Sequence, residues 1–197
     1  MERLILADPQ PGMCDAWRVA FQSFEEVEIR NQKFESVAEY DCMVSAANSF
    51  GLMDGGVDLA IVNYFGKDLE SRVQSHILDH YNGEQPVGSS FIIETQHAAH
   101  PWLAHTPTMR VPMSINGTEN VYLAMKAMLQ AVAAFNANNP ASIRRVVCPG
   151  LGTATGRVSF EVAAAQMALA YRYFKNPPQQ IGWQQAAEIS REIIAAI

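Results

Sequence analysis

The sequence predicts an α/β fold, and two observations lead to this prediction. Short apolar runs of strand length are interspersed with longer segments in which apolar residues recur at helical spacing. Two glycine-rich turns each follow an apolar run and precede a helical pattern, which is where open α/β sheets bind ligands. A chain of 197 residues with 49% hydrophobic composition can bury one full core, so a single domain spanning residues 1–197 is expected.

The amino-terminal segment is predicted to hold two strands with a helix between them. Residues 4–7 form a short apolar strand that ends in a turn containing two prolines. Apolar residues then recur at near-helical spacing, which predicts a helix over about 12–24. Val27 and Ile29 alternate with charged residues, so a second strand is expected within 25–31.

The central segment is predicted to contain a buried strand over 42–47, a glycine-rich turn, and a helix carrying the apolar pattern of residues 57–65. A second helix is expected over 69–81, because Asn82-Gly83 is a typical helix stop. Residues 88–95 are predicted to form a strand. No element is assigned to the segment that follows.

That segment contains His97, His100 and His105, which raises the question of a metal site. No cysteine or carboxylate stands near them at ligand spacing, so no metal site is predicted. Ordinary hydrogen bonding in a loop or at a strand edge is expected, and the lining of a substrate site by one of them stays open as the alternative.

The carboxyl-terminal segment is predicted to contain three helices and one strand. Thr118 is the expected N-cap of a helix with a broad apolar face over 121–135. A strand is expected over 143–148, and Ser159 is the expected N-cap of a helix that ends at about 174. An amphipathic helix over 183–194 is expected to dock on the body of the protein.

The composition of the chain indicates which kinds of partner and which cellular setting to expect. A formal charge of −6 argues against binding the backbone of a long nucleic acid, which usually requires a basic face. The chain shows neither a signal-peptide pattern nor an apolar run of membrane-spanning length, so a cytoplasmic protein that does not insert in membranes is expected. Cys14, Cys42 and Cys148 are far apart and odd in number, which is not typical of a disulfide framework. The oligomeric state stays open.

The first glycine-rich turn carries a concentration of polar residues. Asn48, Asp54 and Asp58 fall within eleven positions that also contain a glycine pair. A tight turn without a ligand is the general alternative for such a sequence, but a core turn has no use for three polar side chains that need partners. The turn is therefore the first candidate for a ligand site.

Both turns resemble the ligand loops of one family. Val44-Ser-Ala-Ala-Asn-Ser49 followed by Asp54-Gly-Gly-Val-Asp-Leu-Ala-Ile61 is similar to the first ligand loop of macrodomains, whose usual pattern is Val-Asn-Ala-Ala-Asn and then Gly-Gly-Gly-Val, often with Asp. Cys148-Pro-Gly-Leu-Gly-Thr-Ala-Thr-Gly156 stands where that family has its phosphate-cradling loop. The resemblance covers roughly residues 27–174.

The resemblance implies a three-layer α/β/α macrodomain-like fold with a central mixed sheet. Typical macrodomains have another strand after the second loop and its helix, and none is found here. The additional strand and helix at the amino terminus are candidates to take that place in the sheet.

The resemblance also implies the ligand, ADP-ribose or an ADP-ribosylated substrate, and no cofactor. Its diphosphate would lie between the two loops, and Asn48 would bind the hydroxyls of the ribose farther from adenine. An Asx-type turn in which Asn48 caps its own loop is the alternative for that side chain. The further ligand-binding positions are Ala47, Asp54, Gly55, Gly56, Val57, Gly150, Leu151, Gly152, Thr153, Ala154, Thr155 and Gly156.

Recognition of the base is less defined. Macrodomains usually carry Gly-Asp-Ile before the first loop, and the acid accepts a hydrogen bond from the adenine amine. This chain has Lys33, Phe34 and Glu35 there. Phe34 can stack on the base or fill the core, and Glu35 can accept from adenine or be a solvated charge; both pairs of alternatives stay open.

Many members of the family hydrolyse the bond between the distal ribose and an acceptor, and Asp58 occupies the acidic position that helps to activate water. Asp58 with Asn48 is therefore the candidate catalytic pair, and stabilisation of the helix dipole is the alternative role of Asp58. Two departures weaken a hydrolase assignment: Asp54 replaces the first glycine of the triplet, and Ala154 and Thr155 replace an aromatic residue.

The sequence thus predicts an ADP-ribose-binding protein, with hydrolysis at the distal ribose as the first hypothesis and a non-catalytic ADP-ribose-binding module as the second. A dinucleotide-dependent oxidoreductase is a third, because Gly150 to Gly156 superficially matches a glycine fingerprint. Its spacing is not Gly-x-Gly-x-x-Gly, and no strand with a ribose-binding acid follows it.

Overall fold

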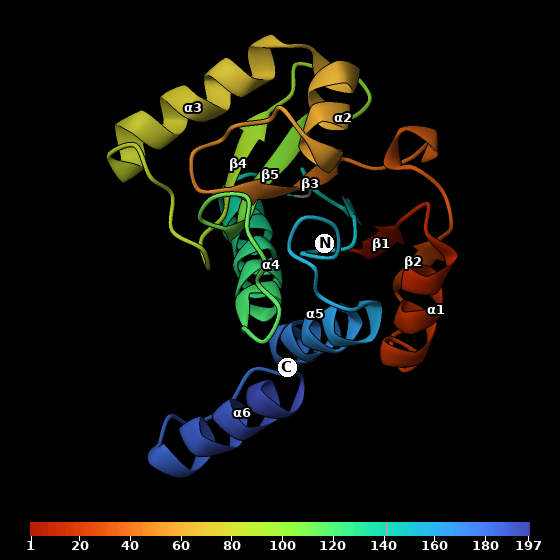
Figure 1. The fold of residues 1–197 in the computed structure, drawn as a ribbon, viewed down its shortest axis with the longest axis vertical. Coiled ribbons are helices and arrows are strands. Elements are labelled where there is room, and N and C mark those ends of the chain that lie inside the picture. Colours follow the sequence, from red (N-terminus) through yellow and green to blue (C-terminus); the bar gives the residue numbers. More distant parts are fainter. Residues whose placement is uncertain (141) are drawn as a thin grey trace.

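The computed structural model describes residues 1–140 and 142–197, and its centre is a six-stranded sheet (Figure 1). The strands are β1 (Arg3–Ala7), β2 (Val27–Arg30), β3 (Cys42–Asn48), β4 (Phe91–Glu94), β5 (Trp102–Met109) and β6 (Arg145–Cys148). Their order is β2-β1-β6-β3-β5-β4, and all neighbours are parallel except β4, which pairs antiparallel with β5. The mixed sheet that the sequence predicts is confirmed.

Helices cover both faces of this sheet. They are α1 (Pro11–Ala20), α2 (Gly56–Phe65), α3 (Asp68–Tyr81), α4 (Asn120–Asn138), α5 (Phe160–Lys175) and α6 (Trp183–Ala195), with a short 3-10 helix at Phe34–Ser36. The helices α2 and α3 pack on one face, and α1, α4 and α5 pack on the other. The predicted three-layer α/β/α architecture is therefore confirmed.

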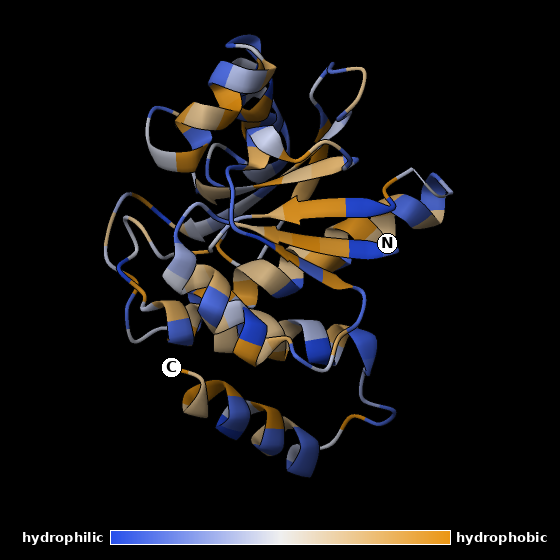
Figure 2. Ribbon diagram, turned by 90° about the vertical axis from the view of Figure 1, so that its right-hand side faces the viewer, coloured by the Kyte–Doolittle hydropathy of each residue, from blue (hydrophilic) through white to orange (hydrophobic). Residues whose placement is uncertain are grey.

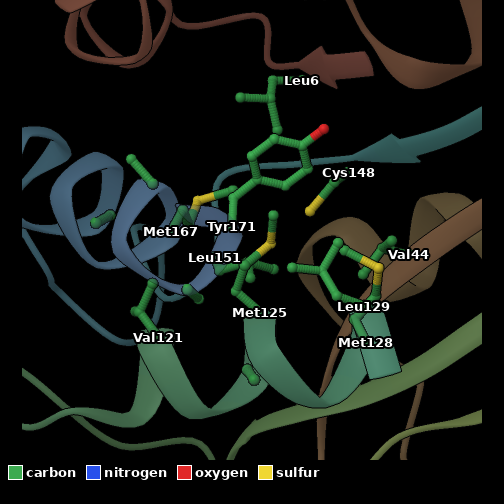
Figure 3. Close-up of a cluster of buried hydrophobic side chains, with 14 of the residues drawn as sticks. Leu6, Val44, Val121, Met125, Met128, Leu129, Cys148, Leu151, Met167 and Tyr171 are labelled. Atoms are coloured by element: carbon green, nitrogen blue, oxygen red, sulfur yellow. The ribbon is translucent and has the colours of Figure 1, made fainter. Parts of the chain in front are cut away.

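The strands are hydrophobic on both faces because each face is covered. Along β1, Leu4 and Leu6 join the core on the side of α1, α4 and α5, whereas Ile5 and Ala7 join the core under α2 and α3. Figure 2 shows the apolar strands in the middle and hydrophilic residues on the outer faces of the helices. In Figure 3, side chains of α4 and α5, including Met125 and Tyr171, meet those of the strands.

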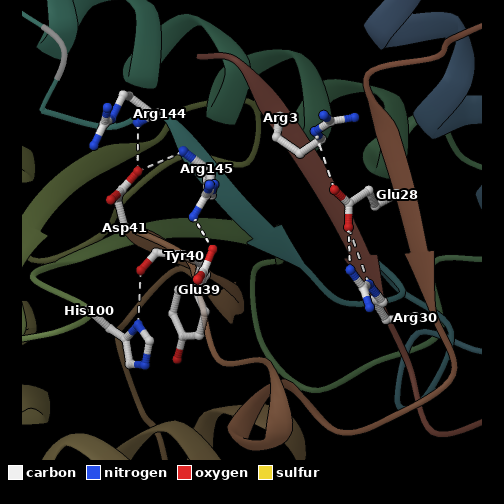
Figure 4. A network of polar contacts seen from close by, with 9 residues as sticks. All are labelled: Arg3, Glu28, Arg30, Glu39, Tyr40, Asp41, His100, Arg144 and Arg145. Carbon is white, nitrogen blue, oxygen red and sulfur yellow. Dashed lines mark hydrogen bonds and ion pairs between the residues drawn. The ribbon is translucent and has the colours of Figure 1, made fainter.

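The amino-terminal strand joins the sheet beside the strand of the second loop. β1 pairs in parallel with β6, and β2 adds to β1 at the edge. Polar contacts near the amino-terminal ends of the strands join β6 to the start of β3 and β1 to β2 (Figure 4). Asp41 Oδ2 accepts from the backbone N–H groups of Arg144 and Arg145, at 2.7 Å each, and Arg3 pairs with Glu28 across β1 and β2.

The sequence analysis missed one strand. β5 lies inside the sheet between β3 and β4, within the segment to which no element was assigned. Pro107 interrupts the strand pattern because proline cannot donate to a ladder. The structure accommodates it because β4 pairs only with the first half of β5, up to His105.

Three smaller expectations can be compared with the structure: one is wrong, one is confirmed and one is confirmed only in part. The N-cap of α4 is Glu119 rather than Thr118, whose hydroxyl donates to the carbonyl of Ile115 at 2.7 Å. Ser159 caps α5 as predicted, accepting from Val162 N–H. The helix α6 docks on α5 through the buried Ile193, but Trp183 is 93% exposed at its start.

All three cysteines are buried with free thiols, and burial is the main cause that raises the pKa of each one. None of the described helices combines the length and the apolar character needed to cross a membrane.

Candidate functional site

A single cleft runs along the edge of the sheet where the parallel strands end. Its volume is about 470 Å³, within the range of small-molecule sites. The wall of the cleft follows the order of the strands across the sheet. It consists of residues after β2, residues after β1, the second loop after β6, the first loop after β3, and the end of β5. The two glycine-rich loops are therefore neighbours, because β6 and β3 pair directly.

The first loop opens its backbone to the cleft. Gly55 is the N-cap of α2 and Gly56 follows with a φ of +56°, a conformation that favours glycine. A Cβ atom added at either position would meet nothing within 4 Å. The first N–H groups of a helix have no partner within it, so those of Gly56 and Val57 are available to an anionic group.

The second loop is held tightly against the core. The carbonyl of Gly152 accepts from Val158 N–H, and that of Gly156 accepts from Ile115 N–H. The N–H groups of Ala154 and Thr155 donate to no acceptor within the described part of the chain, and both residues are exposed. This loop thus offers donors at its tip while its glycines pack inward.

Asn48 uses its side chain within its own loop. The Nδ2 group donates to the carbonyl of Leu52 at 2.7 Å, and Oδ1 accepts from the N–H groups of Phe50 and Leu52 at 3.1 and 3.3 Å. This is the self-capping arrangement that the sequence left as an alternative. One Nδ2 hydrogen is left for a ligand.

Asp58 lies in the first turn of α2 and is 6% exposed. The Ser45 hydroxyl donates to its Oδ1 at 2.6 Å. Burial raises the pKa of Asp58 to about 6, the Ser45 hydrogen bond opposes the rise, and the charge of Glu70 adds to it. The carboxyl group therefore changes its protonation near neutral pH, as a general base in a site requires.

Comparisons with known proteins decide the family. The model of the Macro domain family matches residues 44–167, more than half of the chain. The chain belongs to the macrodomain family. An uncharacterized protein of Aquifex aeolicus (strain VF5) is 30% identical over 156 residues, which are 79% of this chain and 86% of that protein.

Solved macrodomain structures share the fold at low sequence identity. The macrodomain of Mycobacterium tuberculosis DarG superposes with a TM-score of 0.59 at 16% identity, covering 71% of this chain and 86% of that one. The Oceanobacillus iheyensis macrodomain with ADP gives 0.58 at 18% identity, covering 81% and 85%. Thermosipho africanus DarTG in complex with ADP-ribose gives 0.60 at 11% identity, covering 90% of this chain and 54% of that one.

Within this macrodomain, the candidate catalytic and ligand-binding residues that the resemblance implied all line the cleft except Leu151. The Leu151 side chain is buried in the core beside α4 and α5. Phe34 is 4% exposed and its ring packs edge-on against Tyr64, so it fills the core beneath the wall of the cleft that it lines. Glu35 is partly exposed at the same wall.

The histidines do not line the cleft of the macrodomain. His105 is fully buried, its Nδ1 lies 2.6 Å from Gln85 Oε1, and burial lowers its pKa to about 3. His100 Nδ1 lies 2.9 Å from the carbonyl of Tyr40 (Figure 4). The described residues contain no group of three side chains that could hold a metal ion.

Several residues of the cleft were not predicted from the sequence; most belong to other strands or follow them, whereas Ala46, Leu52, Ala60 and Pro149 lie within or beside the two loop motifs. The residues not predicted are Ala7, Asp8, Pro9, Gln10, Lys33, Ala46, Leu52, Ala60, Thr108, Met109, Pro112 and Pro149. A polar residue at the carboxyl end of a strand is the signal that could have found one of them, since Asp8 directly follows β1. Thr108 and Met109 had no such signal because β5 was not recognised.

Proposed function

We propose that this macrodomain binds ADP-ribose, free or attached to a substrate, in the cleft between its two glycine-rich loops. The observation that carries the proposal is that both loops border one cleft of suitable size along neighbouring strands. Bound ADP in the Oceanobacillus iheyensis macrodomain and bound ADP-ribose in Thermosipho africanus DarTG support it.

The diphosphate would bind through backbone donors rather than side-chain cations. Lys33 is the cation among the lining residues, whereas Asp8, Glu35, Asp54 and Asp58 are acids. A diphosphate in such a site needs local attraction from N–H groups, which α2 supplies through Gly56 and Val57 and the second loop supplies at its tip.

Hydrolysis at the distal ribose is the proposed activity, with Asp58 as the base that deprotonates water. A pKa of about 6 leaves the carboxylate mostly ionised at pH 7.5 and still basic enough to accept a proton. One observation favours the alternative of a binding module without turnover: the amide of Asn48, which would orient the ribose, is largely committed to its own loop.

Binding is tested by thermal unfolding with ADP-ribose, ADP, AMP and NAD, followed by calorimetry. Selective stabilisation by ADP-ribose is the expected result, because a ligand that binds the native state raises its melting temperature. Equal responses to AMP and ADP-ribose, or no response to any of them at millimolar concentration, would overturn the proposal.

Turnover is tested separately by the release of ADP-ribose from a modified protein. Asp58→Ala should slow release by about a hundredfold or more and leave the affinity for ADP-ribose within a few fold. Asp79→Ala, on the exposed surface of α3, is the matched control and should change neither. Tight binding without release by the wild-type protein would assign the binding-module function instead.

A further inference from the structure

One end of the cleft is built by a segment outside the family match. The matched region begins at residue 44, yet Ala7, Asp8, Pro9 and Gln10 line the cleft. They reach it because β1 pairs with β6 and so ends beside the second loop. The site is therefore completed by the turn between β1 and α1.

The carboxylate of Asp8 is fixed in this wall. Its Oδ1 accepts from Gln10 N–H at 2.9 Å, and its Oδ2 accepts from Gly150 N–H at 3.3 Å. The backbone carbonyl of Asp8 accepts in turn from Asn31 Nδ2 at 3.0 Å. Contacts from three segments thus hold one anionic acceptor at the cleft, and the N–H group of Gly150 is already used.

The surroundings of Asp8 differ from those at the other end of the cleft. On the side of β1 and β2 the wall includes the apolar residues Ala7, Pro9 and Phe34. On the side of β3 and β5 it includes Asn48 and Thr108. A flat heterocycle fits the first environment, and sugar hydroxyls, which need donors and acceptors, fit the second.

We infer that Asp8 determines base specificity: it accepts a hydrogen bond from the exocyclic amine of the base at the β1 end of the cleft. This inference rests on the proposed binding of ADP-ribose. A fixed carboxylate can only accept, so it favours a base that presents a donor and disfavours one that presents a carbonyl oxygen. The same charge keeps phosphate groups away from this end.

Glu35 is the competing acceptor. Glu35 is partly exposed and lies within the 3-10 helix Phe34–Ser36. A carboxylate in contact with water must give up that solvation and order its side chain to bind an amine. Asp8 is also partly exposed, but two backbone N–H groups already hold its carboxylate, so this preorganisation makes it the stronger discriminator.

The test is calorimetric titration with ADP-ribose and with inosine diphosphate ribose, in which a carbonyl replaces the amine. Wild-type protein should bind ADP-ribose at least about tenfold more tightly. Asp8→Asn should abolish or invert this ratio, because its amide can donate to the carbonyl. Glu35→Gln and Asp15→Asn, on the exposed face of α1, should keep the wild-type ratio.

Thermal unfolding without ligand establishes that Asp8→Asn is folded. If it is not, Asp8→Ser, whose hydroxyl can accept from the N–H group of Gln10, takes its place, with an expected ratio near one. An unchanged ratio in the folded variant, or a ratio that changes only in Glu35→Gln, overturns this inference and leaves ADP-ribose binding intact. Failure of the wild-type protein to bind ADP-ribose overturns both.

Discussion

The two glycine-rich loops look alike in the sequence and differ in what their glycines do. In the first loop, a Cβ atom at Gly55 or Gly56 would enter open space at the cleft. In the second loop, a Cβ atom at Gly156 would stand 2.4 Å from the carbonyl oxygen of Gly152, and one at Gly152 would stand 2.9 Å from Ile115. The first pair lets a ligand approach the backbone, whereas the second lets the chain pack on itself.

The two loops also differ in the polar contacts that surround them. The first loop leads into α2, whose first turn buries the carboxyl group of Asp58 and thereby raises its pKa. The second loop is tied to β1 and to the segment before α4 by hydrogen bonds from Gly150 and Ile115. The first loop thus exposes backbone at the cleft and leads to a buried carboxyl group, whereas the glycines of the second loop pack against neighbouring parts of the chain.

The largest effect is expected for Gly156→Ala. The clash involves backbone atoms, which no side-chain rotation relieves, so the free energy of unfolding should fall by about 3 kcal/mol. Denaturant unfolding measures it. Gly182→Ala is the matched control, because a Cβ atom at that position would meet nothing within 4 Å and the φ of −164° suits any residue. Equal stability of the two variants would contradict the packing role of the second loop.

Asp58→Asn should stabilise the protein at neutral pH. The folded-state pKa of Asp58 is raised from 3.8 to about 6, so protonation favours the fold and wild-type stability falls as pH rises from about 4 to 6. The amide keeps an acceptor for Ser45 and carries no charge. The expected gain is on the order of 2 kcal/mol above pH 7 and vanishes near pH 4.

Denaturant unfolding of Asp58→Asn and wild type at pH 4, 6 and 8 measures this difference. Glu70→Gln provides a comparison, because the charge of Glu70 is a smaller contributor to the raised pKa. A gain independent of pH would show that the Asp58 carboxyl group is not destabilised in the fold.

Gly55→Ala should separate binding from stability. Gly55 has an extended backbone with a φ of −148°, so alanine fits without strain and the melting temperature should hardly change. The added methyl group enters the cleft, and the affinity for ADP-ribose should fall about tenfold, or about 1.4 kcal/mol. Calorimetry checks this result, and unchanged affinity would remove Gly55 from the binding surface.

The smallest effect is expected for Ser45→Ala. Loss of its hydrogen bond to Asp58 should reduce the free energy of unfolding by about 1 kcal/mol and raise the pKa of Asp58 further. The acid limb of the pH profile for ADP-ribose release should move to higher pH. Ser75→Ala, on the exposed face of α3, should leave the profile unchanged. If the pH profile of ADP-ribose release is unchanged in both variants, the protonation of Asp58 does not control the rate of release.

The sequence allowed both loops to be located because each is a contiguous motif whose neighbours are its own strand and helix. It did not reveal Asp8, because the contact of Asp8 with Gly150 joins residues 142 positions apart through the pairing of β1 and β6. β5 was missed because Pro107 conflicts with a strand pattern, a conflict that only the short partner strand β4 resolves.

Side-chain direction accounts for the remaining differences. Leu151 belongs to the second loop by position, but its apolar side chain turns into the core, as the hydrophobic effect requires. The alternatives for Asn48 depended on which backbone groups its loop would present, and a short turn brings those of Leu52 within reach.

The buried cysteines have a practical consequence. Maleimide reagents are attacked by thiolates, and the three native thiols are both inaccessible and held protonated. A single cysteine introduced by Ala154→Cys, at the exposed tip of the second loop, would therefore accept a fluorophore without removal of the others. Its emission would report occupancy of the cleft that residue 154 lines, in an otherwise native chain and without a modified substrate.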